Sequence, residues 1–282
     1  MSVKVKKIYS ENNDFQHIEV IKRNREKRNK YKEFFVEGVK SIELALKNHW
    51  EIVSYIYSSE RRLSQWATNI LEHSKAETHF DLPLSLMEKL SDRNEGSELM
   101  AVVSMPGNDR SRIKIDSNLL LIVFDRPSSP GNLGTMIRSC DAFKANGLII
   151  TGHGVDIYDP QTIRSSIGTL FSLPVLRMEQ NELFEWFKEL KEVYGDLSLI
   201  GTSAKAERYI NEVDFTKPTV LLLGNETEGL SKNYKSSCHQ LVKIPIWGSA
   251  SSLNVACAAS ISLYEIDSQR RATGKSKSIP LT

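Results

Sequence analysis

Apolar residues in the second half of the chain fall into short, uninterrupted runs. The runs are LLLIVFD (119–125), GLIITG (147–152), LPVLRM (173–178), LSLIGTS (197–203), TVLLLGN (219–225) and LVKIPIW (241–247). Runs of this length, separated by helical stretches such as NELFEWFKELKEVY (181–194), are typical of parallel strands buried on both faces of a sheet. The pattern predicts an α/β domain with a mostly parallel sheet, whose last element is an apolar helix over 253–266.

The first part of the chain shows a different pattern. The apolar spacing in KEFFVEGVKSIELALKN predicts an amphipathic helix over 32–48. Strands are expected at 52–58, 77–83 and 98–105, with helices at 61–74 and 84–92 between them. The polar stretch 106–118 contains Pro and Gly and reads as a connection. We therefore expect a small α/β domain over 1–110, a linker at 111–117 and a second domain over 118–282.

Composition narrows the class of protein. Hydrophobic residues make up 40% of the 282 residues and charged residues 26%, which is typical of a globular chain. No apolar run approaches the ~20 residues of a membrane helix, and the first residues lack the apolar core of a signal peptide. The three cysteines, Cys140, Cys238 and Cys257, form no CxxC pair, so neither a disulfide framework nor a zinc site is expected. These features favour a cytoplasmic protein.

Positive charge is concentrated near the N-terminus. One short stretch holds a single acid, Glu26, and seven basic residues: Lys22, Arg23, Arg25, Lys27, Arg28, Lys30 and Lys32. Such a block can contact the phosphates of a nucleic acid, or it can be the solvated face of a helix. The block alone leaves both interpretations open.

Small polar residues follow several of the predicted strands. In open parallel sheets, ligands bind beyond the carboxyl ends of the strands, so these segments are candidate binding loops. None matches a dinucleotide fingerprint or a P-loop, GSASS (248–252) is not the GxSxG elbow of a hydrolase, and the histidines lack metal-binding spacing. The usual nucleotide, hydrolase and metal sites are therefore not indicated.

Three of these segments, taken together, carry a specific resemblance. They are PGNLGTMIRSCDAF, with Asn132 and Arg138, LLLGNETEGLS (221–231) and IPIWGSASSLNVACA (244–258). In this order they resemble the three signature motifs of the SpoU/TrmH family in the SPOUT superfamily. The resemblance implies a homodimeric RNA ribose 2′-O-methyltransferase that uses S-adenosylmethionine and needs no metal, with a C-terminal trefoil knot.

The N-terminal segment FFVEGVKSIELAL resembles the ribosomal-protein-like, RNA-binding domain that many members of this family carry. Many members have a His-Gln-Gly turn where this chain has Arg93-Asn94-Glu95-Gly96. The resemblance favours ribosomal RNA over tRNA as the partner. A tRNA methyltransferase and a non-catalytic RNA-binding protein of the same fold remain the alternatives.

The resemblance also implies which residues form the site. The catalytic set would be Arg138, Asn132, Glu226 and Asn254, and the cofactor would contact Thr202, Ser203, Gly224, Asn225, Gly229, Ile244, Ile246, Ser252 and Leu253. The basic block from Lys22 to Lys32 would bind RNA.

The sequence leaves more than one role open for several of these residues. Arg138 would either accept the proton of the 2′-hydroxyl or stay charged and stabilise the developing alkoxide. Glu226 would serve equally well as a cap for a helix that starts near Leu230. Asn254 with Ser252 suits a helix cap, and Asn132 suits a turn.

Overall fold

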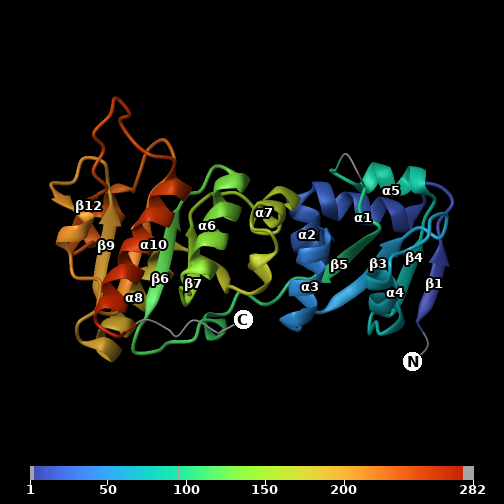
Figure 1. Cartoon of the computed structure of the whole chain (residues 1–282), viewed down its shortest axis with the longest axis horizontal. Helices are drawn as coiled ribbons and strands as arrows, with labels where there is room; N and C mark the ends of the chain where they lie inside the picture. The colour runs from blue at the N-terminus through green and yellow to red at the C-terminus, as the bar shows by residue number, and fades with distance from the viewer. Residues whose placement is uncertain (1–2, 94–95, 276–282) are drawn as a thin grey trace. The chain divides into compact units, whose positions relative to one another are not determined.

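The computed structural model describes residues 3–93 and 96–275, shown in Figure 1. The chain divides into two compact units, Met1–Gly107 with Asp156–Ser172, and Asn108–Val155 with Leu173–Thr282. Residues 156–172 therefore belong to the first unit, although they follow a strand of the second. Two parts of the expected elements lie outside the described residues. They are Asn94 and Glu95, in the turn that differs from the family's His-Gln-Gly, and the last residues of the expected second domain (276–282).

The first unit is built on a five-stranded sheet with the order β1-β4-β3-β5-β2. Strand β5 is antiparallel to β2 and β3, and the other neighbours are parallel. The elements, in chain order, are β1 (Lys4–Lys7), α1 (Asn13–Arg23), α2 (Arg25–Tyr31), β2 (Glu33–Glu37), α3 (Val39–Lys47), β3 (Ile52–Tyr57), α4 (Gln65–Glu72), β4 (Thr78–Asp81), α5 (Leu84–Leu90), β5 (Leu99–Ser104), α7 (Pro160–Ser165) and the short 3-10 helix η2 (Thr169–Phe171).

The helix predicted over 32–48 is wrong in its first part. Residues 33–37 form strand β2, in which Phe34, Phe35 and Val36 are buried. Aromatic and β-branched side chains suit a pleated surface, and β2 pairs along its whole length with β5. Gly38, at a φ of 108° that favours glycine, then turns the chain into α3.

The second unit contains a seven-stranded sheet with the order β10-β12-β9-β11-β6-β7-β8, and every neighbouring pair is parallel. Its elements are η1 (Arg110–Arg112), β6 (Leu120–Asp125), α6 (Pro130–Ala142), β7 (Gly147–Thr151), β8 (Val175–Met178), α8 (Gln180–Tyr194), β9 (Ser198–Thr202), β10 (Arg208–Tyr209), η3 (Ile210–Glu212), β11 (Thr219–Leu223), α9 (Lys232–Ser237), β12 (Gln240–Lys243) and α10 (Val255–Ala272). The six predicted strands and the mostly parallel sheet are confirmed, and the two-residue strand β10 is additional.

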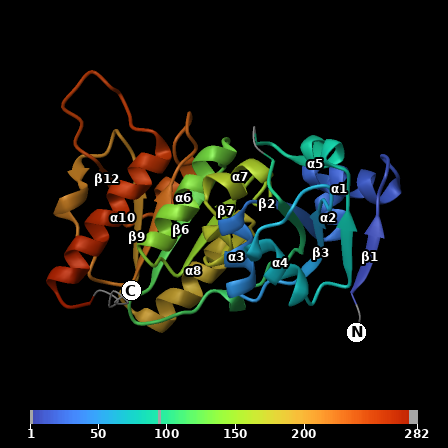
Figure 2. The same cartoon turned by 45° about the vertical axis from the view of Figure 1, so that its right-hand side comes forward.

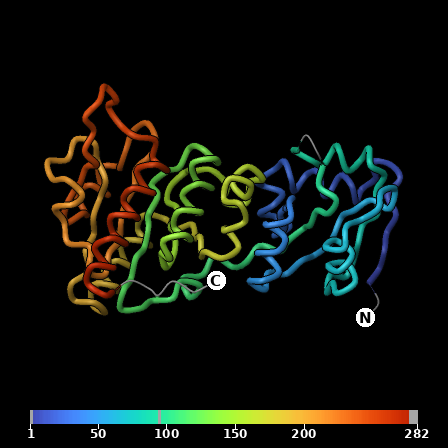
Figure 3. Tube along the Cα trace, in the orientation of Figure 1, coloured from blue at the N-terminus to red at the C-terminus, as the bar shows by residue number. Residues whose placement is uncertain are grey.

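Both faces of this sheet are covered, as the apolar runs require. Leu121 and Val123 of β6 pack on one face with Trp186 and Phe187 of α8. Helices α6 and α10 lie side by side over the sheet (Figures 1 and 2), joined by a 2.8 Å hydrogen bond between the hydroxyls of Ser139 and Ser260. The trace in Figure 3 shows the long segment between β12 and α10 projecting beyond the rest of its unit.

Candidate active site

The loops that carry the three sequence motifs meet at one edge of the second sheet. Strands β12, β9, β11 and β6 are successive neighbours and all run in the same direction. Their carboxyl ends therefore share an edge, where ligands of open α/β sheets bind. Asn132 follows β6, Ser203 follows β9, Gly224 follows β11 and Ile244 follows β12.

Glu226 binds the start of α6. Its carboxylate accepts hydrogen bonds from the backbone N–H of Ser128 (3.0 Å), the hydroxyl of Ser128 (2.7 Å), the N–H of Ser129 (3.1 Å) and Nδ2 of Asn132 (3.1 Å). Glu226 thus places a negative charge at the N-terminus of α6, where the helix dipole favours it. The capping role expected for Glu226 falls on α6, and not on the helix after Leu230.

Asn132 links Glu226 to Asn254. Because Asn132 donates through Nδ2 to the carboxylate, its Oδ1 is left to accept a 3.0 Å hydrogen bond from Nδ2 of Asn254. The Oδ1 of Asn254 then accepts from the N–H of Ala256 (2.9 Å), which caps α10. Glu226, Asn132 and Asn254, which we call the polar bridge, connect all three motifs, and the carboxylate sets the direction of both amides.

The electrostatics of Glu226 suit a structural anchor. Desolvation raises the pKa of Glu226, but hydrogen bonds from Ser128 and Asn132 outweigh it, and the pKa falls below its ordinary value of 4.5. A carboxylate with a lowered pKa is a weak base and stays ionised at neutral pH. The geometry therefore favours a positioning role for Glu226 over a role in proton transfer.

A second connection between the first two motifs was not anticipated from the sequence. Arg126, at a φ of 52°, donates to Asp125 (3.1 Å), to Glu228 and to the carbonyl of Gly229 (3.2 Å). Asn225 donates in return to the carbonyl of Arg126 (2.7 Å). Hydrogen bonding to Asp125 raises the pKa of Arg126. The sequence contains one sign of this connection, which is the charged pair Asp125-Arg126 at the end of an apolar strand.

Asp125, the buried last residue of β6, is also part of this second connection. It is 2% exposed and accepts from the N–H of Ser231 (2.9 Å) as well as from Arg126. The loop 224–231 is therefore attached on one side through Glu226 and on the other through Asp125 and Arg126.

Gly224 has no room for a side chain. A Cβ added there would lie 2.0 Å from the backbone nitrogen of Leu230 and 2.1 Å from the carbonyl carbon of Gly229. The loop folds back on itself at this point, with hydrogen bonds between the backbones of Asn225 and Gly229 (3.2 and 2.9 Å). Gly229 takes a φ of 69°, which glycine adopts readily. The loop therefore requires glycine at position 224 and favours it at position 229.

The remaining residues expected at the cofactor lie around the same edge. Thr202 and Ser203 are partly exposed at the end of β9, Ile244 and Ile246 are partly exposed after β12, and Ser252 and Leu253 are exposed before α10. None of the nine residues carries a charge. Apolar side chains of this kind can hold an adenine, while hydroxyls and backbone groups can bind a ribose, so the residues present fit S-adenosylmethionine.

Arg138 stands apart from the polar bridge. It lies on the exposed face of α6, about 9 Å along the helix axis from Asn132 at 1.5 Å per residue. Across residues 3–93 and 96–275, no carboxylate pairs with its guanidinium. The structure therefore joins Asn132, Glu226 and Asn254 to each other and leaves Arg138 free for a partner from outside.

Two members of the basic block serve the fold of the first unit. Lys22 is 6% exposed and pairs with Asp92 at 2.6 Å. Arg28 is 2% exposed and binds the carbonyls of Ile21 and Lys22 as well as Asp156 (2.7 Å). The expectation that these two side chains contact RNA is corrected, because both are buried. The exposed members are Arg23, Arg25, Lys27, Lys30 and Lys32.

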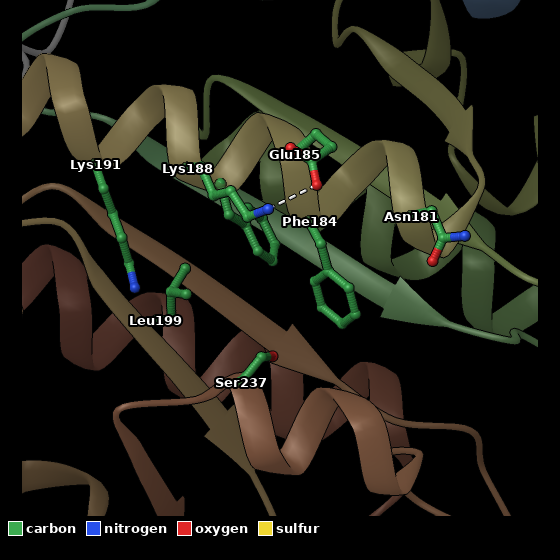
Figure 4. Close-up of a pocket in the computed structure, with 8 residues that line it drawn as sticks. Asn181, Phe184, Glu185, Lys188, Lys191, Leu199 and Ser237 are labelled. Carbon is green, nitrogen blue, oxygen red and sulfur yellow. Dashed lines mark hydrogen bonds and ion pairs between the residues drawn. The ribbon is translucent and has the colours of Figure 1, made fainter.

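One hollow of the second unit lies apart from the candidate site. The hollow in Figure 4, of about 430 Å³, lies between α8 and Ser237, and includes none of the expected site residues. Within 3–93 and 96–275, no group of three or more His, Cys, Asp or Glu side chains is arranged to hold a metal ion. No described helix is long and apolar enough to span a bilayer.

Two family models and several known proteins match this chain. A family model described as the SpoU rRNA Methylase family matches residues 119–264, and one described as a SpoU L30e-like domain matches residues 12–101. A 23S rRNA (uridine(2479)-2′-O)-methyltransferase of Streptomyces viridochromogenes is 42% identical over 277 residues, 98% of this chain and 96% of that protein. The 23S rRNA (guanosine(2553)-2′-O)-methyltransferase RlmP of Bacillus subtilis is 27% identical over 243 residues, 86% of this chain and 91% of that protein.

A solved structure is similar over nearly the whole chain. The SpoU methyltransferase AviRb from Streptomyces viridochromogenes, in complex with the cofactor AdoMet, has a TM-score of 0.88 and 42% identity, and the match covers 93% of this chain and 99% of that one.

Proposed function

Because this chain belongs to the SpoU rRNA Methylase family, we propose that it methylates the ribose 2′-oxygen of one uridine in 23S rRNA. The predicted family is confirmed, and the protein is an S-adenosylmethionine-dependent RNA ribose 2′-O-methyltransferase. The choice of 23S rRNA and of uridine rests on the relative that matches 98% of this chain. The structural observation that supports a single methyl-transfer site is the polar bridge, which ties the three motifs to one another at one edge of the sheet.

Different residues of this chain would align the reactants and stabilise charge during methyl transfer. S-adenosylmethionine supplies the methyl group when it is bound. Glu226, Asn132 and Asn254 hold the three loops in register, so that the sugar oxygen and the methyl donor can be aligned. The guanidinium of Arg138, exposed and without a carboxylate partner among the described residues, stabilises the negative charge that develops on the 2′-oxygen, and the proton of the hydroxyl passes to solvent water.

A homodimer forms part of this proposal. Helix α10 buries Leu263 and Ile266 against its own unit, yet exposes Ile261 (41%) and Tyr264 (57%) on another side. A second copy of the chain would cover these apolar side chains. Light scattering of the protein and of a Tyr264→Glu variant tests this, since the charge should shift the mass toward a monomer.

The trefoil knot and the cytoplasmic location are also proposals. After β11 the chain passes to β12, on the far side of β9, and then returns to α10 beside α6. This path, together with the likeness in fold to AviRb, supports a knot. The family's ribosomal RNA substrate supports a cytoplasmic location.

Labelled methyl transfer tests the proposed function directly. The protein is incubated with labelled S-adenosylmethionine and either an unmodified 23S rRNA transcript or bulk tRNA, and the labelled nucleotide is then mapped. We expect a single 2′-O-methyluridine in the 23S transcript. Transfer to tRNA alone would overturn the choice of substrate, and binding of RNA without any transfer would support the non-catalytic alternative.

A further inference from the structure

Trp247 lies in the middle of the third motif with its indole in water. It is 88% exposed, the highest value among the large hydrophobic side chains of the described residues. Across the described ranges, the indole makes no hydrogen bond and stacks on no ring. Burying such a side chain is favourable, so its exposure is not explained by the fold of this unit.

The surroundings of Trp247 suit a nucleic acid. The segment from Ile244 to Asn254 contains no acidic residue, and its three serines, Ser249, Ser251 and Ser252, are exposed. An aromatic side chain next to small hydroxyl residues combines a rigid stacking surface with adaptable hydrogen bonding. The segment projects from the sheet edge in Figures 1 and 2. It contains the expected cofactor residues Ile246 and Leu253.

The strands next to this segment add positive charge. Lys243 ends β12 four residues before Trp247, within ~14 Å along an extended chain. Its ammonium lies 4.8 Å from the ring centre of Tyr209 on β10. Lys205 and Arg208 are exposed around β10, where the exposed acids Glu207, Glu212 and Asp214 offset them. Lys243, at the end of β12, is therefore the cation of this segment that would attract a phosphate.

We propose that Trp247 stacks on an unpaired RNA base beside the target ribose. The inference rests on the proposed function and deepens it, because it names a specificity-determining contact for the RNA. Methylation of a 2′-oxygen requires a nucleotide that the enzyme can reach, and unpaired bases are held by stacking on aromatic side chains. Stacking accepts any base, so Trp247 would select for an unstacked nucleotide and not for a particular letter.

A set of substitutions separates stacking from other uses of the side chain. Binding of an unmodified 23S rRNA transcript is measured for Trp247→Ala, Trp247→Leu and Trp247→Phe. Stacking on one base supplies ~1–3 kcal/mol, so the Ala and Leu variants should bind about 5- to 150-fold more weakly, whereas Phe should stay within about threefold of the native protein. Val193→Ala, which shortens another exposed apolar side chain on α8, is the matched control and should bind as the native protein does.

Further measurements test whether Trp247 contacts the cofactor or a second copy of the chain instead of RNA. S-adenosylmethionine binding by calorimetry and the mass in solution should be unchanged in all the variants. A loss of cofactor affinity, or a change from dimer to monomer without a loss of RNA affinity, would overturn the proposal. So would a Leu variant as tight as the Phe variant, since that would indicate apolar contact without stacking. Native protein that fails to methylate the transcript would instead refute the proposed function.

Discussion

Replacing Asn132 by Asp tests the polar bridge with a change of a single group. The native Nδ2 lies 3.1 Å from the carboxylate of Glu226. In Asn132→Asp, an oxygen replaces that donor and two carboxylates face each other. Oδ1 of residue 132 would still accept from Asn254, so only the Glu226 side of the bridge is broken.

The cost follows from the distance. Two unit charges 3.1 Å apart repel by about 5 kcal/mol at an effective dielectric constant of ~20, and by about 1 kcal/mol in bulk water. Glu226 is partly exposed, so we expect the free energy of unfolding of the second unit to fall by about 2–3 kcal/mol at pH 8.

The effect should depend on pH with a definite sign. Repulsion raises the pKa of the carboxyl pair in the folded state above its value of ~4 in the unfolded chain. The destabilisation is therefore complete above the raised pKa and disappears as the pH falls toward ~4. The native protein behaves in the opposite way, because the lowered pKa of Glu226 contributes stability above its ordinary value of 4.5 that is lost only at lower pH.

Urea unfolding at pH 8 and pH 5.5 measures this difference. Asn132→Ala, which removes the hydrogen bonds without adding a charge, is the control and should show little pH dependence in this range. The double variant Asn132→Asp with Glu226→Gln restores a single charge and should recover part of the loss. A defect in Asn132→Asp that is equal at both pH values, or that the second substitution does not relieve, would refute the bridge as described.

Three further predictions concern other parts of the molecule. Arg138→Ala should slow methyl transfer by about 100- to 1,000-fold while calorimetry shows unchanged S-adenosylmethionine affinity; weaker cofactor binding would contradict a role in chemistry. Gly224→Ala should lower the unfolding free energy by about 3 kcal/mol or more, whereas Gly248→Ala, where a Cβ meets nothing within 4 Å, should be neutral; equal effects would refute the close contact. Lys27→Gln should lower the salt dependence of RNA binding by about one released counterion without altering stability. Arg28→Gln should instead lower the unfolding free energy of the first unit by about 3 kcal/mol, because Asp156 loses its partner. Urea unfolding of both variants distinguishes these two outcomes.

The strands of the second unit could be predicted because their signal is local. Strand β6 is buried at every position, and a run of apolar residues records this directly. Strand β2 has no such separate signal, because only Gly38 lies between its five residues and the amphipathic helix α3. The two patterns merge in the sequence, and only pairing with β5 makes residues 33–37 extended.

The motif residues could be recognised, but their partners could not. Glu226 binds Asn132 across 94 positions of the chain, and Asn132 binds Asn254 across 122. A local pattern cannot specify such pairs, so the sequence suggests the neighbouring helix after Leu230 as the one that Glu226 would cap, whereas Glu226 binds the start of α6. The same limit explains Arg28, whose acidic partner lies 128 residues away.

The excursion of residues 156–172 bears on how this enzyme can be dissected. Within the first unit, Phe34 packs against Tyr158 and Phe171, with ring centres 4.6 and 6.1 Å apart, and Trp50 donates to the carbonyl of Phe171. A truncated protein that began near residue 108 would keep Tyr158 and Phe171 but lose Phe34 and Trp50. The two remaining aromatic side chains would be exposed to solvent, and the truncated protein should tend to aggregate. The two units therefore cannot be separated by cutting the chain between the two family-matched ranges, because residues 156–172 would remain with the second unit.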